Sequence, residues 1–146
     1  MAPPRPPRSR RAARKRALDV LYEADLKDAP IPQVLAGYLD PDADEPLPDF
    51  TVALVRGVHR HREELDALIG ATARDWTLSR MPVVDRNLLR IAVYEILHDP
   101  EVPAAVAINE AVDLAKELST DDSGRFINGL LGRIASQHAE AVAPES

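Results

Sequence analysis

The residues with the clearest chemical potential form a basic cluster near the start of the chain. Six arginine and lysine residues lie between positions 8 and 16, and no acidic residue occurs before Asp19. Positive charge at a helix N-terminus opposes the helix dipole, at about 0.3 to 1 kcal/mol per charge, so helix stability does not explain the cluster. Phosphate groups would explain it, because a basic side chain that neutralises a phosphate releases counterions. The cluster therefore predicts binding to a nucleic acid.

An aromatic residue shares a helix face with this cluster. Arg11, Lys15 and Tyr22 are four and seven residues apart, which places them on neighbouring turns of one face. Planar basic groups beside an aromatic ring suit single-stranded RNA, whose unpaired bases can stack on such surfaces. The alternative is a solvated basic arm in which Tyr22 is half-buried and binds nothing.

The remaining polar residues do not form a recognisable catalytic or metal site. The four histidines include no pair at the four-residue spacing that lets one helix face hold zinc. The acidic segment that begins at Asp40 has Glu45 where a calcium loop needs glycine and Thr51 where it needs glutamate. The chain has no cysteine, phosphate-binding glycine loop or GxSxG motif. We therefore expect no metal, no cofactor and no enzymatic activity; an unrecognised hydrolase would need a pocket with convergent polar groups.

Length and composition favour one helical domain in a reducing compartment. The 146 residues suit a single compact domain, and the absence of cysteine fits the cytoplasm. No apolar run approaches the ~20 residues of a membrane span. Seven of the 18 basic residues lie in the first 16 positions, and the remainder of the chain carries 11 basic and 24 acidic residues. An acidic body with a basic arm indicates a local anionic partner.

Apolar periodicity predicts about seven helices that would position these residues. A helix capped by Ser9 runs to about Lys27, and a short helix covers 34–39. Two helices share 50–69, and a helix over 84–98 has an apolar surface too wide for one face, so it should lie centrally. Further helices cover about 103–118 and a segment that follows 119–123 and ends near residue 138.

Ordered motifs run through the second half of the chain. They are Arg90-Ile-Ala-Val-Tyr-Glu-Ile96, Val102-Pro103, Val106-Ala-Ile-Asn-Glu-Ala-Val-Asp-Leu-Ala-Lys116, Asp122-Ser123 and Phe126-Ile-Asn-Gly-Leu-Leu131. These motifs closely resemble the NusB family of bacterial transcription antitermination factors over roughly residues 80 to 134. The arginine-rich first helix, with Ala17, Leu21 and Tyr22, resembles the beginning of the same family. The segment from Tyr38 to Glu64 shows little resemblance.

The resemblance implies an all-α fold with two helical subdomains in one compact domain. We expect a disordered basic arm over 1–8, a helical domain over 9–138 and a frayed tail over 139–146. The N-terminal subdomain would cover about 9–78 and the C-terminal subdomain about 79–138. The resemblance also implies binding of boxA RNA together with NusE, a small-subunit ribosomal protein, and a role in ribosomal RNA synthesis within the transcription elongation complex. NusB proteins occur as monomers and homodimers, and the sequence does not choose between these states.

The resemblance also assigns functions to individual residues. The positions that it implies for RNA binding are Arg10, Arg11, Arg14, Lys15, Arg16, Tyr22, Asp122, Arg125, Phe126 and Asn128. Asp85 occupies an acidic position that NusB proteins use against NusE. Structural alternatives stay open for three of these residues: Phe126 as a core residue, Asp122 as a helix cap and Asp85 as an acid that favours a helix N-terminus. The alternative function is a helical protein-interaction module that does not bind RNA.

Overall fold

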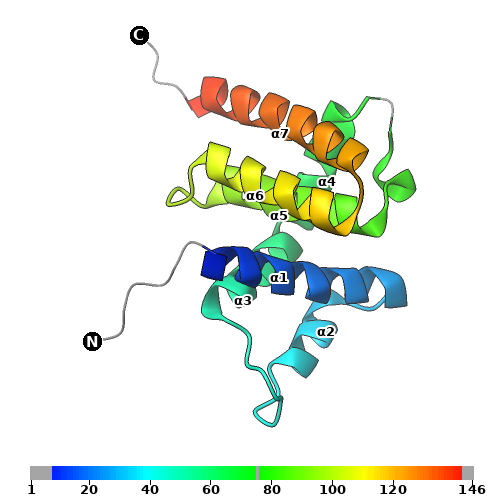
Figure 1. The fold of residues 1–146 in the computed structure, drawn as a ribbon, viewed down its shortest axis with the longest axis vertical. Coiled ribbons are helices and arrows are strands. Elements are labelled where there is room, and N and C mark those ends of the chain that lie inside the picture. Colours follow the sequence, from blue (N-terminus) through cyan, green and yellow to red (C-terminus); the bar gives the residue numbers. More distant parts are fainter. Residues whose placement is uncertain (1–7, 75, 143–146) are drawn as a thin grey trace.

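The computed structural model describes residues 8–74 and 76–142, and over these residues the chain forms seven α-helices, one short 3₁₀ helix and no strand (Figure 1). The elements in chain order are α1 (Arg8–Lys27), α2 (Ile31–Tyr38), α3 (Asp49–Arg60), α4 (Arg62–Thr72), η1 (Leu78–Arg80), α5 (Val83–His98), α6 (Ala104–Leu118) and α7 (Asp121–Val142). The predicted all-α fold is confirmed. No helix in the described ranges is long and apolar enough to cross a membrane.

Helix α5 occupies the centre of the molecule. It packs against α1, α3, α4, α6 and α7, and ten of its sixteen residues are buried. Its apolar residues cover more than one face, so neighbouring helices are needed on several sides to remove them from water. The central position predicted for this helix is therefore confirmed.

The helices pack on two sides of α5. Helices α1, α2 and α3 lie together on one side of α5, whereas α6 and α7 lie on the other (Figure 1). Helix α4 packs against α5 and α7, although the predicted boundary near residue 78 assigned it to the N-terminal half. In its packing α4 therefore belongs with α5 and α7, and its residues Leu65 and Ile69 are buried in the core that all the helices share.

Prolines mark the starts of four helices. Pro30, Pro48, Pro82 and Pro103 are the N-cap residues of α2, α3, α5 and α6. A helix leaves its first N–H groups without partners in any case, so a residue that lacks this donor costs little there. The same reason explains why α2 begins at Ile31, before Pro32, and not at the predicted residue 34.

The two ends of the chain differ from the predicted arm and tail. Helix α1 begins at Arg8, the last residue of the predicted arm 1–8, and residues 1–7 lie outside the described residues. Helix α7 continues to Val142, so four residues of the predicted frayed tail 139–146 are helical. The tail residues 143–146 lie outside the described residues.

Buried and half-buried charges tie the two sides of the molecule together through α5. Asp25 of α1 accepts hydrogen bonds from Arg86, Asn87 and Arg90, at 2.8, 2.9 and 3.2 Å. Arg90 also donates to Asp66 of α4 at 2.7 Å. Burial acts to raise the pKa of Asp25, but the hydrogen bonds from Arg86 and Asn87 and the charge of Arg90 outweigh it, so the pKa lies below its ordinary value. Asp25 therefore remains ionised and anchors α1 to α5.

Candidate nucleic-acid interface

The exposed cations of α1 face acidic residues of α6 in a row of ion pairs. Arg11 donates to Glu110 and to Asp113, each at 2.7 Å, and Lys15 lies 3.1 Å from Glu117. The three acids are three and four residues apart, so they share the face of α6 that looks toward α1. We call these five residues the ion-pair row. Hydrogen bonding to Glu110 raises the pKa of Arg11, although burial opposes it. Any phosphate at these cations must compete with carboxylates.

Arg14 differs from its neighbours because it points into the protein. Its guanidinium forms two hydrogen bonds with Glu95 of α5, at 2.9 and 2.8 Å, and the Arg14 residue is 4% exposed. Because the guanidinium is buried and both of its hydrogen bonds go to Glu95, it is not accessible to a phosphate in the folded structure. We do not retain Arg14 among the RNA-binding candidates.

Arg10 is exposed and contacts α3, whereas Arg16 is half-buried and contacts the loop that precedes α3. The guanidinium of Arg10 lies over the Phe50 ring, 4.6 Å from the ring centre, and its residue is exposed. Arg16 donates to the backbone carbonyl oxygens of Glu45 and Pro46 at 3.3 and 3.5 Å. Arg16 therefore holds the acidic loop between α2 and α3, whereas Arg10 presents a planar cation to solvent.

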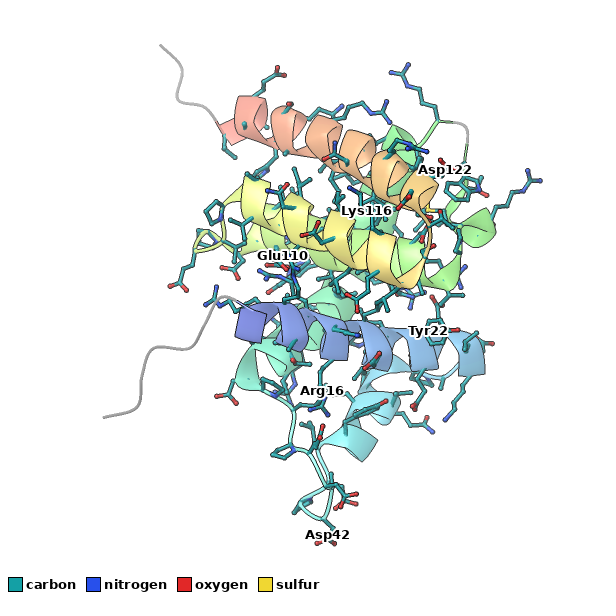
Figure 2. All side chains as sticks on the ribbon, in the orientation of Figure 1. Arg16, Tyr22, Asp42, Glu110, Lys116 and Asp122 are labelled. Carbon is teal, nitrogen blue, oxygen red and sulfur yellow. The ribbon has the colours of Figure 1, made fainter. Side chains whose placement is uncertain are left out.

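Tyr22 is accessible from solvent, as an RNA-stacking residue must be. It is 39% exposed and lies beside a shallow surface hollow that Leu26 also lines. Figure 2 shows Tyr22 toward the same end of the molecule as Asp122, whereas the first turns of α1 lie at the other end. Eleven residues of helix separate Arg11 from Tyr22, which corresponds to roughly 17 Å at the helical rise per residue.

The start of α7 presents the four remaining RNA-binding candidates. Asp122 and Arg125 form an ion pair with each other, and both are exposed, as is Asn128. Phe126 is half-buried, and its ring packs edge-on against Trp76 with 4.9 Å between ring centres. Phe126 thus has a structural role in the core, while its partial exposure leaves an edge at the surface. The predicted residues thus form two groups. The basic residues of the first half of α1 make up the first group, and Tyr22 with the residues at the start of α7 makes up the second, at the other end of α1. They do not form one continuous cationic track.

Asp85 is fully buried and supports the second group from within. It accepts a 2.6 Å hydrogen bond from the Ser123 hydroxyl, and the Ser123 N–H donates to Thr120 Oγ1 at 2.9 Å. These bonds fix the first turn of α7 against α5. Because its carboxylate does not reach the surface, we do not retain Asp85 as a residue that contacts a partner protein directly.

Lys116 is a candidate that the sequence analysis did not single out. It is exposed on α6, which lies between the helix that carries Tyr22 and the helix that carries Asp122 (Figure 2). Its alkyl chain crosses Gly124, where an added Cβ would lie 2.8 Å from Lys116 Cγ. The missing side chain at Gly124 was the available indication that another group passes over the start of α7. Lys116 supplies positive charge at the start of α7, at the opposite end of α1 from the first arginines of that helix.

Comparison with known proteins identifies the family. The model of the NusB family matches residues 11–136, so the chain belongs to the NusB family. It is 58% identical over 130 residues to the transcription antitermination protein NusB of Salinispora arenicola, covering 87% of this chain and 95% of that protein. It is 50% identical over 135 residues to the NusB of Acidothermus cellulolyticus, covering 92% of each chain.

Solved structures agree with this assignment. T. maritima NusB is 36% identical and superimposes with a TM-score of 0.79, covering 95% of each chain. A complex of the antitermination factors NusB and NusE with double-stranded RNA contains a chain that is 27% identical, with a TM-score of 0.77, covering 90% of this chain and 99% of that one. NusB proteins are transcription antitermination factors and not enzymes, which confirms the prediction of a non-enzymatic RNA-associated class.

Proposed function

We propose that this chain binds boxA RNA together with the ribosomal protein NusE, and that it supports ribosomal RNA transcription as part of the elongation complex in the cytoplasm. The strongest support is that Tyr22, Lys116 and the start of α7 are exposed toward the same end of the molecule, where an aromatic ring and a basic side chain are both accessible from solvent (Figure 2). The similar NusB chain solved with NusE and RNA supports the same partners.

RNA binding involves an exchange of partners at the ion-pair row. Arg11 and Lys15 leave the carboxylates of α6 and pair with phosphates. Their contribution to the free energy of RNA binding is therefore the difference between the two kinds of ion pair. Exposed ion pairs contribute only about 0 to 1 kcal/mol each, so the exchange is energetically feasible. It also keeps affinity for RNA alone modest, so we expect NusE to tighten the assembly.

Specific recognition comes from the group of residues at the other end of α1. A base stacked on Tyr22 gains about 1 to 3 kcal/mol, whichever base it is, and Lys116 of α6 pairs with a phosphate of the same strand. Asn128 and Asp122 offer a side-chain amide and a carboxylate that can bond to base edges. The ion-pair row thus contributes salt-dependent affinity, and the Tyr22 end orients the strand.

The decisive experiment titrates a fluorescently labelled boxA RNA with the protein, with and without NusE, over a range of salt concentrations. Binding should be tighter with NusE and weaken uniformly with salt. Replacing Arg11 and Lys15 by alanine together should reduce the slope of log affinity against log salt by about one to two units. An unchanged slope would remove these two residues from the interface.

A second set of variants tests the partner exchange directly. Glu110→Gln with Asp113→Asn leaves Arg11 without its carboxylates, so RNA affinity at low salt should rise several-fold. The matched control is Asp42→Asn with Glu140→Gln, which makes the same change in net charge at exposed positions outside the ion-pair row. An equal rise in both variants would mean that net charge, and not release of Arg11, governs binding.

Arg11 and Lys15 are already paired with acidic residues of α6, and this favours one alternative function, a helical protein-interaction module without RNA binding. In that case the ion-pair row is purely structural, and NusE binds equally well whether or not RNA is present. The same titration separates the two functions, because an interaction module would show no salt-dependent binding of RNA at any NusE concentration.

A further inference from the structure

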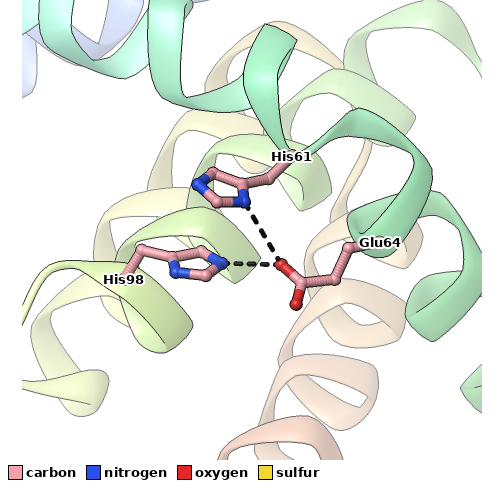
Figure 3. A group of neighbouring side chains, drawn as sticks. All are labelled: His61, Glu64 and His98. Atoms are coloured by element: carbon pink, nitrogen blue, oxygen red, sulfur yellow. Dashed lines mark hydrogen bonds and ion pairs between the residues drawn. The ribbon is translucent and has the colours of Figure 1, made fainter.

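A group of metal-binding side chain types lies at the junction of α3, α4 and α5. His61 is the residue between α3 and α4, Glu64 lies in the first turn of α4, and His98 is the last residue of α5. His98 Nε2 is 2.6 Å from Glu64 Oε1, and His61 Nδ1 is 3.6 Å from the same oxygen (Figure 3). The three potential ligand atoms all lie within 4.8 Å of one another. None of these residues belongs to the candidate RNA-binding surface.

The two imidazole rings are held in a common orientation. They stack with 3.9 Å between ring centres and an angle of 17° between ring planes, and each presents a nitrogen to Glu64 (Figure 3). The two histidines come from the end of α5 and the start of α4, so the spacing of histidines along one helix gives no sign of the pair. His98 and Glu64 are 34 residues apart in the sequence.

Tyr94 supports both rings from one side. Its ring centre is 5.6 Å from that of His98 and 6.0 Å from that of His61. Tyr94 can occupy this position because residue 57 is a glycine: a Cβ there would lie 2.2 Å from Tyr94 Cζ. The close packing of Tyr94 on α3 therefore fixes the position of the tyrosine ring beside both histidines.

The donor set selects a class of ion. Two imidazole nitrogens and one carboxylate form the protein ligands of known zinc sites, with metal–ligand distances of about 2.0 to 2.2 Å and one position left for water. A tetrahedral arrangement at these distances separates ligand atoms by about 3.4 Å, so the side chains need to move by roughly 1 Å. The two stacked rings also need to rotate, because the lone pair of each imidazole nitrogen lies in its ring plane and both must point at one ion. Imidazole ligands disfavour magnesium and calcium, which prefer oxygen.

The surroundings leave room for an ion and for water. The three side chains are 28 to 54% exposed, and a surface hollow of about 690 Å³ borders His61 and Glu64. The neighbouring Arg62 lies 3.5 Å from Asp66, which offsets its positive charge. We propose that His61, Glu64 and His98 bind one divalent transition-metal ion of the zinc type, with water as the remaining ligand.

Metal binding at this site fastens the end of α5 to the start of α4. His61 joins α3 to α4, so a bound ion also fixes the turn between these two helices against the end of α5. A ligand that binds only the folded state stabilises it in proportion to the logarithm of its concentration over Kd. Zinc should therefore raise the melting temperature, without any requirement for RNA.

The test is a zinc titration of the untagged protein in competition with a coloured chelator. The expected result is one zinc ion per chain, with affinity at least tenfold weaker in His61→Ala, Glu64→Gln and His98→Ala. His59→Ala is the matched control, because His59 is exposed two residues from His61 but lies outside the group. Equal loss in the control, or no loss in the three variants, would overturn the proposal.

Two further measurements distinguish a metal site from a histidine–glutamate contact that is only structural. Cobalt, a spectroscopic substitute for zinc, should give visible absorption bands in the native protein that Glu64→Gln abolishes. Zinc at a hundredfold excess over Kd should raise the melting temperature of the native protein by roughly 5 to 10 °C, and should leave that of Glu64→Gln unchanged. A melting temperature that zinc does not change, with no cobalt bands, would contradict metal binding even if the variants fold normally.

Discussion

Arg14 and Arg11 lie one turn apart on the same helix and make the same kind of contact in two different environments. The Arg14 side chain is 5% exposed and that of its partner Glu95 is 1% exposed, whereas the Arg11 side chain is 43% exposed. Water screens the outer pair and can replace either of its partners, but it cannot replace Glu95. The comparison shows that the environment of a cation, and not its place in a basic cluster, decides whether the cation holds the fold together or remains available to a ligand.

The largest effect should come from removing one partner of the inner pair. Glu95→Ala leaves the Arg14 charge buried without a counter-charge, so the free energy of unfolding should fall by about 3 to 5 kcal/mol. Urea denaturation measures the loss. Replacing both partners with apolar residues, Arg14→Met with Glu95→Leu, should recover most of it. A loss below about 1 kcal/mol for Glu95→Ala would mean that the inner pair behaves like a surface pair.

An intermediate effect is expected at Asp25, whose side chain is 13% exposed. Asp25→Asn should cost about 2 to 3 kcal/mol at neutral pH, because the hydrogen bonds from Arg86 and Arg90 lose their charged acceptor.

The pH dependence at Asp25 follows from its lowered pKa. A carboxyl group with a lower pKa in the folded state adds stability that is complete above the unfolded value of about 3.9 and is lost as the pH falls through the folded value. The free energy of unfolding, measured by denaturation at a series of acidic pH values, should therefore decrease less steeply with falling pH for Asp25→Asn than for the native chain. The same decrease in both proteins would show that Asp25 has the same pKa in the folded and unfolded states.

The smallest effect belongs to the outer pairs. A double-mutant cycle with Lys15→Ala and Glu117→Ala should give a coupling energy of about 0.2 to 1 kcal/mol at low salt, and essentially none at roughly 1 M salt, where screening is effective over about 3 Å. A coupling that persists at high salt would show that the ion-pair row is a structural element, which would also weaken its proposed exchange with RNA phosphates.

Sequence periodicity predicted the helices and the central place of α5 because both depend mainly on which residues in a local stretch are apolar. It did not place α4, since that position depends on which surface Leu65 and Ile69 meet after the chain turns at His61. Nor did it distinguish Arg14 from Arg11. Both belong to one basic cluster, and only the approach of Glu95, 81 residues later, makes one of them interior.

Some features of the candidate site could likewise be predicted from the sequence, and others could not. The accessible Tyr22 followed from its position on the first helix, and the resemblance to a family pointed to the start of α7. The burial of Asp85 could not be predicted, because an acid in the first turn of a helix is equally reasonable at the surface. Lys116 was missed because its place beside Gly124 depends on how closely α6 and α7 approach.

The central position of α5 has a consequence for how the molecule opens. Helix α2 packs against α1 and α3 at one edge of the molecule, whereas α5 contacts helices on both sides. Local fluctuations can detach α2 at small cost, but any motion that frees α5 exposes most of the core. Amide hydrogens of α2 should therefore exchange with solvent deuterium far faster than those of α5, which exchange only when the whole chain unfolds.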